Sequence, residues 1–112
     1  MKWQFAFLLV LSLLFLVSCG PNQEQLQNFA TCLTDQGAVM YGASWCVHCK
    51  EQKEMFGDAF VKVNYVECTI EEQRCSEENI SGLPTWKFKD GSILEGALPF
   101  SELESKTGCK LR

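Results

Sequence analysis

Two cysteines and the single histidine of this chain stand together in the run Trp45-Cys46-Val47-His48-Cys49. The run follows a short apolar stretch and opens a stretch of helical character. At a helix start, free backbone N–H groups and the helix macrodipole stabilise a thiolate at Cys46, which lowers its pKa and makes it nucleophilic. Cys49 lies almost one turn further on the same face, so it can resolve a mixed disulfide on Cys46. The pair is therefore expected to cycle between dithiol and disulfide.

His48 lies between the two cysteines, and a histidine can carry positive charge near neutral pH. Positive charge beside the Cys46 thiolate stabilises the reduced protein, which makes the disulfide form more oxidising. This favours an oxidase or isomerase over a strong reductant. The alternative is a solvated histidine with no electronic role.

Two structural interpretations of the Cys46–Cys49 pair remain to be weighed, a plain disulfide and half of a zinc site. A four-ligand zinc site needs two further ligands at suitable spacing, and the chain has no second C-x-x-C and no second histidine. We therefore expect no metal, and we expect no cofactor.

The elements that must position this motif follow from apolar spacing and from glycine, proline and capping signals. In chain order they are a helix over 23–35, a strand over 38–41, a helix over 46–56, a strand over 60–68, a short helix over 71–79, strands over 84–88 and 92–95 around a turn at 89–91, and a helix from 101 that Gly108 ends. Capping boxes are expected to open the helices that follow Thr69 and Ser101. The β-α-β unit predicts a parallel crossover, and the hairpin adds antiparallel strands. The fold class is therefore α/β, a mixed sheet sandwiched by helices.

The first part of the chain is typical of an export signal. The apolar run from Phe5 to Val17 is 13 residues long, short of the roughly 20 residues that a membrane-spanning helix needs. It ends in Leu-Val-Ser-Cys at residues 16–19, which resembles the lipobox of bacterial lipoproteins and makes Cys19 the expected lipidation site. We divide the chain into a signal peptide over 1–18, a tether over 19–25 and one domain over 26–112. An uncleaved N-terminal anchor or an ordinary cleavage site beside a free cysteine is the alternative.

Charge and cysteine content restrict the function further. Lys2 is the only charged residue in 1–18, so its removal changes the net charge from −4 to −5. An acidic domain of this size gives no electrostatic reason to bind nucleic acid. Apart from Cys19 the chain has six cysteines, an even number that is typical of small domains outside the cytoplasm. We expect a monomer at the outer face of the cytoplasmic membrane or in the periplasm.

Two motifs resemble the active site of the thioredoxin superfamily. Trp45-Cys46-x-x-Cys49 is similar to its redox motif, and Gly82-Leu83-Pro84-Thr85 is similar to its cis-proline loop. The resemblance implies a thioredoxin-like fold in which Pro84 is cis and faces the cysteines. It also implies that Leu83 offers main-chain groups to a client peptide and that Trp45 is an exposed contact for client chains.

A closer likeness covers most of residues 29–108. The runs 41–53, 64–68 and 84–86 are similar to the thioredoxin-like domain associated with bacterial vitamin K epoxide reductase homologues. Those domains take electrons from folding secreted proteins and pass them to the membrane enzyme and its quinone. The likeness implies the same role here, with client proteins as substrates and a separate membrane chain as redox partner.

The sequence departs from these relatives at two positions. The closer group has proline before its histidine, where this chain has Val47. Thioredoxins and disulfide isomerases carry a buried acid six residues before the first cysteine, and here that residue is Met40. Proton transfer to and from Cys49 must therefore use water or another group, which the sequence does not name.

The remaining cysteines are expected to be structural. Cys68 and Cys75 enclose a short acidic segment, and the closer group likewise has cysteines around this position. Cys32 and Cys109 would then pair with each other, although six cysteines permit 15 pairings. A second redox relay through Cys68 and Cys75, or through Cys32, is the alternative.

Three functions are compatible with these residues. The first is oxidation of client dithiols through Cys46 and Cys49, with electrons passed to a quinone-linked membrane partner. The second is a thiol reductant supplied by a membrane donor. The third is a non-catalytic binding module whose C-x-x-C is only a disulfide.

Overall fold

Four short strands form one mixed sheet in the computed structural model, which describes residues 20–112. They are β1 (Val39–Gly42), β2 (Tyr65–Glu67), β3 (Thr85–Lys87) and β4 (Ile93–Glu95), in the sheet order β2-β1-β3-β4. β1 pairs with β2 in parallel, and the other two pairings are antiparallel. The mixed sheet predicted from the order of elements is therefore confirmed.

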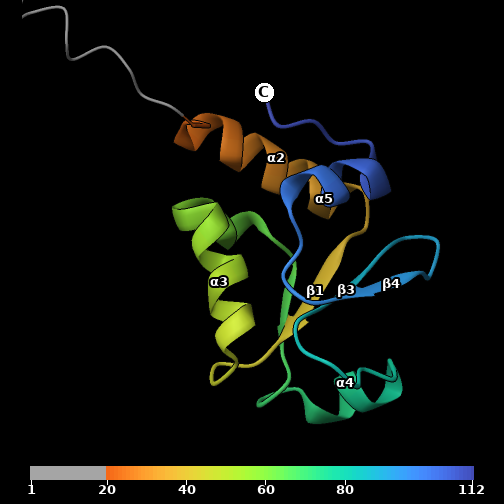
Figure 1. The fold of residues 1–112 in the computed structure, drawn as a ribbon. Coiled ribbons are helices and arrows are strands. Elements are labelled where there is room, and N and C mark those ends of the chain that lie inside the picture. The colour runs from red at the N-terminus through yellow and green to blue at the C-terminus, as the bar shows by residue number, and fades with distance from the viewer. Residues whose placement is uncertain (1–19) are drawn as a thin grey trace, which may run out of the picture.

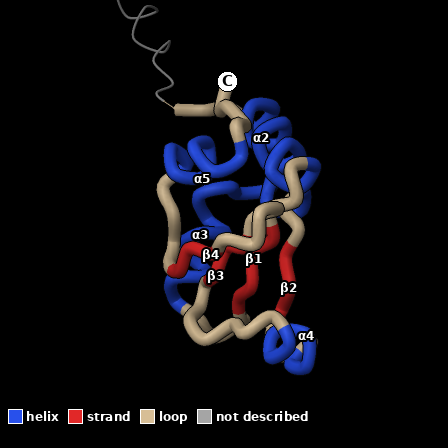
Figure 2. Tube along the Cα trace, turned by 90° about the vertical axis from the view of Figure 1, so that its right-hand side faces the viewer, coloured by secondary structure: helices blue, strands red, loops and turns tan. Residues whose placement is uncertain are grey.

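Helices cover the sheet on both faces (Figures 1 and 2). They are α2 (Gln23–Asp35), α3 (Val47–Phe56), α4 (Glu72–Glu77) and α5 (Phe100–Thr107), with a 3-10 helix η2 (Gly57–Lys62) directly after α3. The large core cluster joins α2, α3 and α5 to one face of the sheet, where Met40 and Trp86 are fully buried. The smaller cluster places Cys75 of α4 against Tyr41 and Val66 on the opposite face.

The alternation of side chains along β1 explains this division. Met40 points to the large core and Tyr41 to the small one, because successive residues of a strand face opposite sides. Within the large core, the ring of Phe56 packs edge-on against Phe100 with centroids 4.9 Å apart. This aromatic packing holds α3, and with it the cysteine motif at its start, against the sheet.

Gln52 is a fully buried polar residue on the inner side of α3. Its Oε1 accepts hydrogen bonds from Trp86 Nε1 at 3.0 Å and from the Leu98 N–H at 2.6 Å, and its Nε2 donates to the Leu98 carbonyl at 3.2 Å. Each of these groups would otherwise be buried without a partner. Gln52 therefore connects α3 to β3 and to the segment that precedes α5.

Several boundaries follow the sequence signals. α2 occupies the predicted range, and Asn22 with Gln25 forms a capping box at its start, so the helix begins inside the segment 19–25 that was expected as a tether. α3 ends at Phe56 with Gly57 as its cap, and Gly108 ends α5 in the left-handed conformation, with φ 78°.

None of the helices within residues 20–112 has the length and apolar character needed to cross a membrane. The predicted signal peptide and Cys19 lie outside the described residues.

Three expectations were wrong. The strand predicted over 60–68 is limited to β2, because Phe60 belongs to η2, where its ring packs edge-on against Tyr65 at 5.4 Å. Thr69 does not cap α4, since its hydroxyl donates to Glu67. Ser101 does not cap α5, because the helix begins one residue earlier and Pro99 is its N-cap. In each case a contact from elsewhere in the fold, or an earlier helix start, replaces the local pattern.

Candidate active site

Cys46 is the N-cap residue of α3 and is joined to Cys49 by a disulfide, with their Cα atoms 5.2 Å apart. The Cys46 sulfur accepts a hydrogen bond from the backbone N–H of Cys49 at 3.2 Å. This N–H belongs to the first turn, where helix donors have no intrahelical partner. When the disulfide is opened, the same donor and the helix dipole stabilise negative charge on Cys46.

The two sulfurs differ in access to solvent. Cys49 is 0% exposed and Cys46 is 7% exposed, while the flanking residues Trp45 and Val47 are 72% and 68% exposed. Of the two cysteines, only Cys46 therefore keeps contact with solvent. The arrangement favours Cys46 as the sulfur that exchanges with other molecules and Cys49 as the sulfur that resolves.

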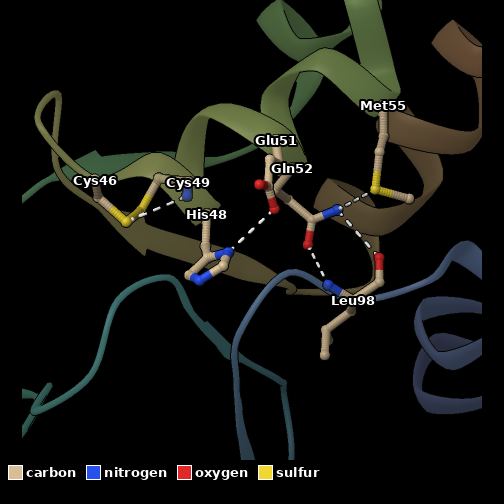
Figure 3. Close-up of polar contacts among 7 residues, drawn as sticks. All are labelled: Cys46, His48, Cys49, Glu51, Gln52, Met55 and Leu98. Carbon is tan, nitrogen blue, oxygen red and sulfur yellow. Dashed lines mark hydrogen bonds and ion pairs between the residues drawn. A yellow bond between two sulfur atoms is a disulfide. The ribbon is translucent and has the colours of Figure 1, made fainter.

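His48 is exposed, and its ring is directed toward Glu51 (Figure 3). Its Nδ1 pairs with the Glu51 carboxylate at 3.1 Å rather than with a cysteine sulfur. An exposed pair at this helical spacing contributes little to stability.

The proline loop lies at the same edge of the sheet as the cysteines. The Leu83–Pro84 peptide bond is cis, and Pro84 directly precedes β3. β3 runs antiparallel to β1 with Thr85 opposite Tyr41, so the start of β3 lies beside the end of β1 that leads to Cys46. Among the described residues, neither main-chain group of Leu83 has a backbone hydrogen-bond partner.

Glu67 at the end of β2 connects this edge into one network. Its carboxylate accepts hydrogen bonds from the Tyr65 hydroxyl at 2.9 Å, from the Thr69 hydroxyl at 2.8 Å and from the Ser44 N–H at 3.1 Å. Burial alone would raise the pKa of Glu67, but these hydrogen bonds together lower it below its ordinary value. The network holds the loop between β1 and α3 through Ser44.

Neither Glu67 nor Tyr65 is among the site residues predicted from the sequence. The Tyr65 ring is only partly buried, and the Lys53 ammonium lies 4.1 Å from its centroid. The sequence does indicate that Tyr65 and Glu67 lie on one face, because residues two apart on a strand face the same side. The sequence does not indicate that this strand lies beside the cysteine motif.

The other four described cysteines form two disulfides. Cys32 of α2 is joined to Cys109, which follows α5, and Cys68 is joined to Cys75 of α4. The first closes a long loop and the second a short one, with sequence separations of 77 and 7 residues. Within residues 20–112, no cluster of three or more potential ligands is placed to hold a metal ion.

Comparison with known proteins identifies the class to which this fold and site belong. The family model for thioredoxin matches residues 21–106, and this chain belongs to the thioredoxin family. The mixed sheet between helices is the thioredoxin fold. The X-ray structure of Fasciola hepatica thioredoxin is similar, with a TM-score of 0.49 and 24% identity over 65% of this chain and 79% of that one.

Two curated relatives are similar in sequence. Thiol-disulfide oxidoreductase LTO1 of Arabidopsis thaliana is 43% identical over an alignment of 88 positions, which covers 70% of this chain and 23% of that protein. Probable protein disulfide-isomerase ER-60 of Schistosoma mansoni is 34% identical over an alignment of 109 positions, which covers 83% of this chain and 21% of that protein. The chain thus spans less than a quarter of the length of either relative.

Proposed function

We propose that this protein is a thiol–disulfide oxidoreductase that works outside the cytoplasm through Cys46 and Cys49. One observation carries the proposal: a disulfide at the start of α3 joins Cys46, which keeps a small exposed fraction of 7%, to Cys49, which has none. The names of both curated relatives denote disulfide chemistry, which supports it.

The reaction proceeds in two exchanges. A client thiolate attacks the Cys46 sulfur, the Cys46–Cys49 bond breaks, and Cys49 leaves with the electron pair and takes up a proton. A second client thiolate then attacks the client sulfur of the mixed disulfide, and Cys46 leaves as a thiolate. The client gains a disulfide and the protein is left as the dithiol, so two electrons have moved to the protein.

Client recognition uses the surroundings of Cys46. We propose that the exposed Trp45 ring contacts the apolar part of a client. The unpaired main-chain groups of Leu83 form hydrogen bonds with the backbone of an extended client chain beside the cis-proline loop. Both features belong to the edge of the sheet where Cys46 lies.

The direction of electron flow is proposed to be from client to protein. The N–H of Cys49 at the start of α3 favours the Cys46 thiolate, and hence the reduced protein, which makes the disulfide a good oxidant. Reductant activity, supplied by a membrane donor, is the second candidate.

Equilibration with glutathione redox buffers measures the reduction potential of the pair. We expect a value between about −180 and −120 mV, the range of disulfide isomerases and strong oxidases. A value near that of thioredoxin, about −270 mV, would reject the oxidase direction and leave the reductant.

The reduced protein must pass its electrons on. We propose a membrane partner of the vitamin K epoxide reductase type, supplied as a separate chain, because the runs around Cys46, Cys68 and Pro84 resemble the domain associated with those enzymes. Anchoring through a lipid on Cys19 would hold the domain at the same membrane surface. Incorporation of labelled palmitate into the wild-type protein, and not into Cys19→Ala, tests the anchor.

A further inference from the structure

The residue that transfers the Cys49 proton in related proteins, a buried acid, is missing from this chain. Cys49 is 0% exposed, and it must lose a proton whenever it attacks a mixed disulfide on Cys46 and regain one whenever it leaves. Met40, which occupies the position of the family's buried acid, has no group that can accept or donate a proton.

The strand register brings two other proton-bearing groups to this place. In the parallel pairing of β1 and β2, Met40 is opposite Tyr65 and Gly42 is opposite Glu67. Residues two apart on a strand face the same side, so Met40, Gly42, Tyr65 and Glu67 all face α3. Tyr65 and Glu67 therefore lie one strand away from the absent acid, on the side of the sheet that carries Cys49.

Gly42 shows how closely the groups approach. A β-carbon placed on Gly42 would lie 3.1 Å from the Tyr65 hydroxyl oxygen and 3.2 Å from the Cys49 sulfur. The same position is 2.9 Å from the Tyr65 ring, closer than real β-carbons come. The hydroxyl and the sulfur therefore border the same small space beside Gly42, which a single water molecule could bridge.

The Tyr65 hydroxyl is already part of a proton path. It donates to Glu67 Oε1 at 2.9 Å, so its lone pairs remain free to accept a proton from a thiol. Burial of the ring, with the hydrogen bond to Glu67 and its charge, raises the pKa of Tyr65, whereas the pKa of Glu67 is lowered. At rest the hydroxyl is therefore protonated and the carboxylate is charged, and a proton that reaches the carboxylate is readily released.

We propose that Tyr65 and Glu67 carry the proton to and from Cys49, in place of the acid absent at Met40. This inference rests on the proposed thiol–disulfide exchange and names the groups that complete its resolving step.

In the resolving step, one S–S bond forms as another breaks. The Cys49 sulfur bonds to the Cys46 sulfur, the bond between Cys46 and the client sulfur breaks, and the client leaves as a thiolate. The Cys49 proton passes to the Tyr65 oxygen while the Tyr65 hydroxyl proton passes to Glu67 Oε1. Glu67, which is only partly buried, then releases that proton to solvent. When a client attacks the Cys46–Cys49 disulfide, the same path returns a proton to Cys49.

Tyr65→Phe tests the path because it removes the hydroxyl and keeps the ring that packs on Phe60 and Lys53. Fully reduced protein is mixed with oxidised glutathione, quenched with acid and analysed by mass spectrometry. The glutathione adduct on Cys46 forms by the first exchange and disappears when Cys49 attacks. General-base assistance contributes about 10²–10⁴-fold, and water replaces part of it. We therefore expect adduct formation to be unchanged and its loss to slow at least about tenfold at pH 7.

The pH profile separates this role from a structural one. The titratable groups that face Tyr65 are Glu67 on β2 and, from α3, Cys49, Cys46 at its start, and Lys53. Without the path, resolution requires prior ionisation of Cys49, so its rate in Tyr65→Phe should rise about tenfold per pH unit below the thiol pKa of about 8.5. In the wild-type protein the rise should be much shallower.

Tyr41→Phe is the matched control, because it removes the chain's other tyrosine hydroxyl from the opposite face of the same sheet. Glu67→Gln should slow adduct loss in the same way as Tyr65→Phe. Equal resolution rates in Tyr65→Phe and wild type at every pH, or equal slowing by Tyr41→Phe, would overturn the proton path. Wild-type protein that forms no adduct at all would instead refute the proposed exchange.

Discussion

Replacement of Cys46 by serine is expected to lower the rate of disulfide exchange by at least about a thousandfold. A serine hydroxyl is neither an effective nucleophile toward a disulfide nor able to form one. Cys49 cannot substitute, because it is buried beneath the start of α3. The reduction of insulin disulfides by dithiothreitol, followed with and without the protein, measures the effect.

A control variant addresses the competing redox relay. Cys68→Ala/Cys75→Ala removes the short-loop disulfide on the face opposite α3. We expect it to keep most of the exchange rate at temperatures where it is folded. Unchanged exchange in Cys46→Ser, or loss of exchange only in the Cys68 and Cys75 variant, would transfer the chemistry to the other disulfide. If the wild-type protein catalyses no exchange, the remaining interpretation is a non-catalytic binding module.

Loss of the Cys32–Cys109 disulfide is expected to cost about 4 kcal/mol of unfolding free energy. The chain-entropy model gives this value because the bond closes a loop with a separation of 77 residues. The bond also fixes the C-terminal segment to α2, beside which α5 packs through the edge-on contact of Phe29 with Phe100 (Figure 1). For a domain of this size the melting temperature should fall by about 4–8 °C for each kcal/mol lost.

Urea unfolding of Cys32→Ala/Cys109→Ala against the wild type measures this difference, with Cys46 and Cys49 kept in the same redox state in both proteins. The separation of 7 residues between Cys68 and Cys75 predicts a smaller loss of about 2 kcal/mol for their double variant. A loss below 1 kcal/mol for the long loop, or a larger one for the short loop, would contradict the loop-closure account.

The sequence was sufficient for the parts of the site that depend on local signals. Cys46 could be placed at the start of α3 because an apolar strand precedes it and Gly57 ends the helix. The hairpin of β3 and β4 was predicted in the same way from the turn at 89–91. These features depend on residues that are neighbours along the chain.

Local signals failed where another contact competed with them. Ala59 and Val63 are apolar because they pack on the core at η2 and at its end. In sequence, however, these apolar residues run on into the strand at Tyr65 and look like part of it. The threonine that matched a capping box bonds instead to Glu67, which is only two residues away and better placed. Pattern alone does not distinguish these alternatives, because each pattern is correct for an isolated segment.

The proton path could not be predicted because it depends on the register between two strands. A shift of one residue would turn Tyr65 and Glu67 to the opposite face of the sheet. Only the pairing of Gly42 with Glu67, and the space that glycine leaves beside Cys49, bring these groups together. The absence of an acid at Met40 was visible in sequence, whereas its replacement was a property of the fold.

The most direct test of the proposed chemistry is to trap the mixed disulfide. Reduced Cys49→Ala is incubated with a peptide that contains one disulfide, and the products are separated without reductant and mapped by mass spectrometry. Cys46 should form a stable bond to the peptide, which dithiothreitol releases, and Cys46→Ser/Cys49→Ala should form none. No adduct, or an adduct on a cysteine other than Cys46, would contradict the assignment of Cys46 as the exchanging sulfur.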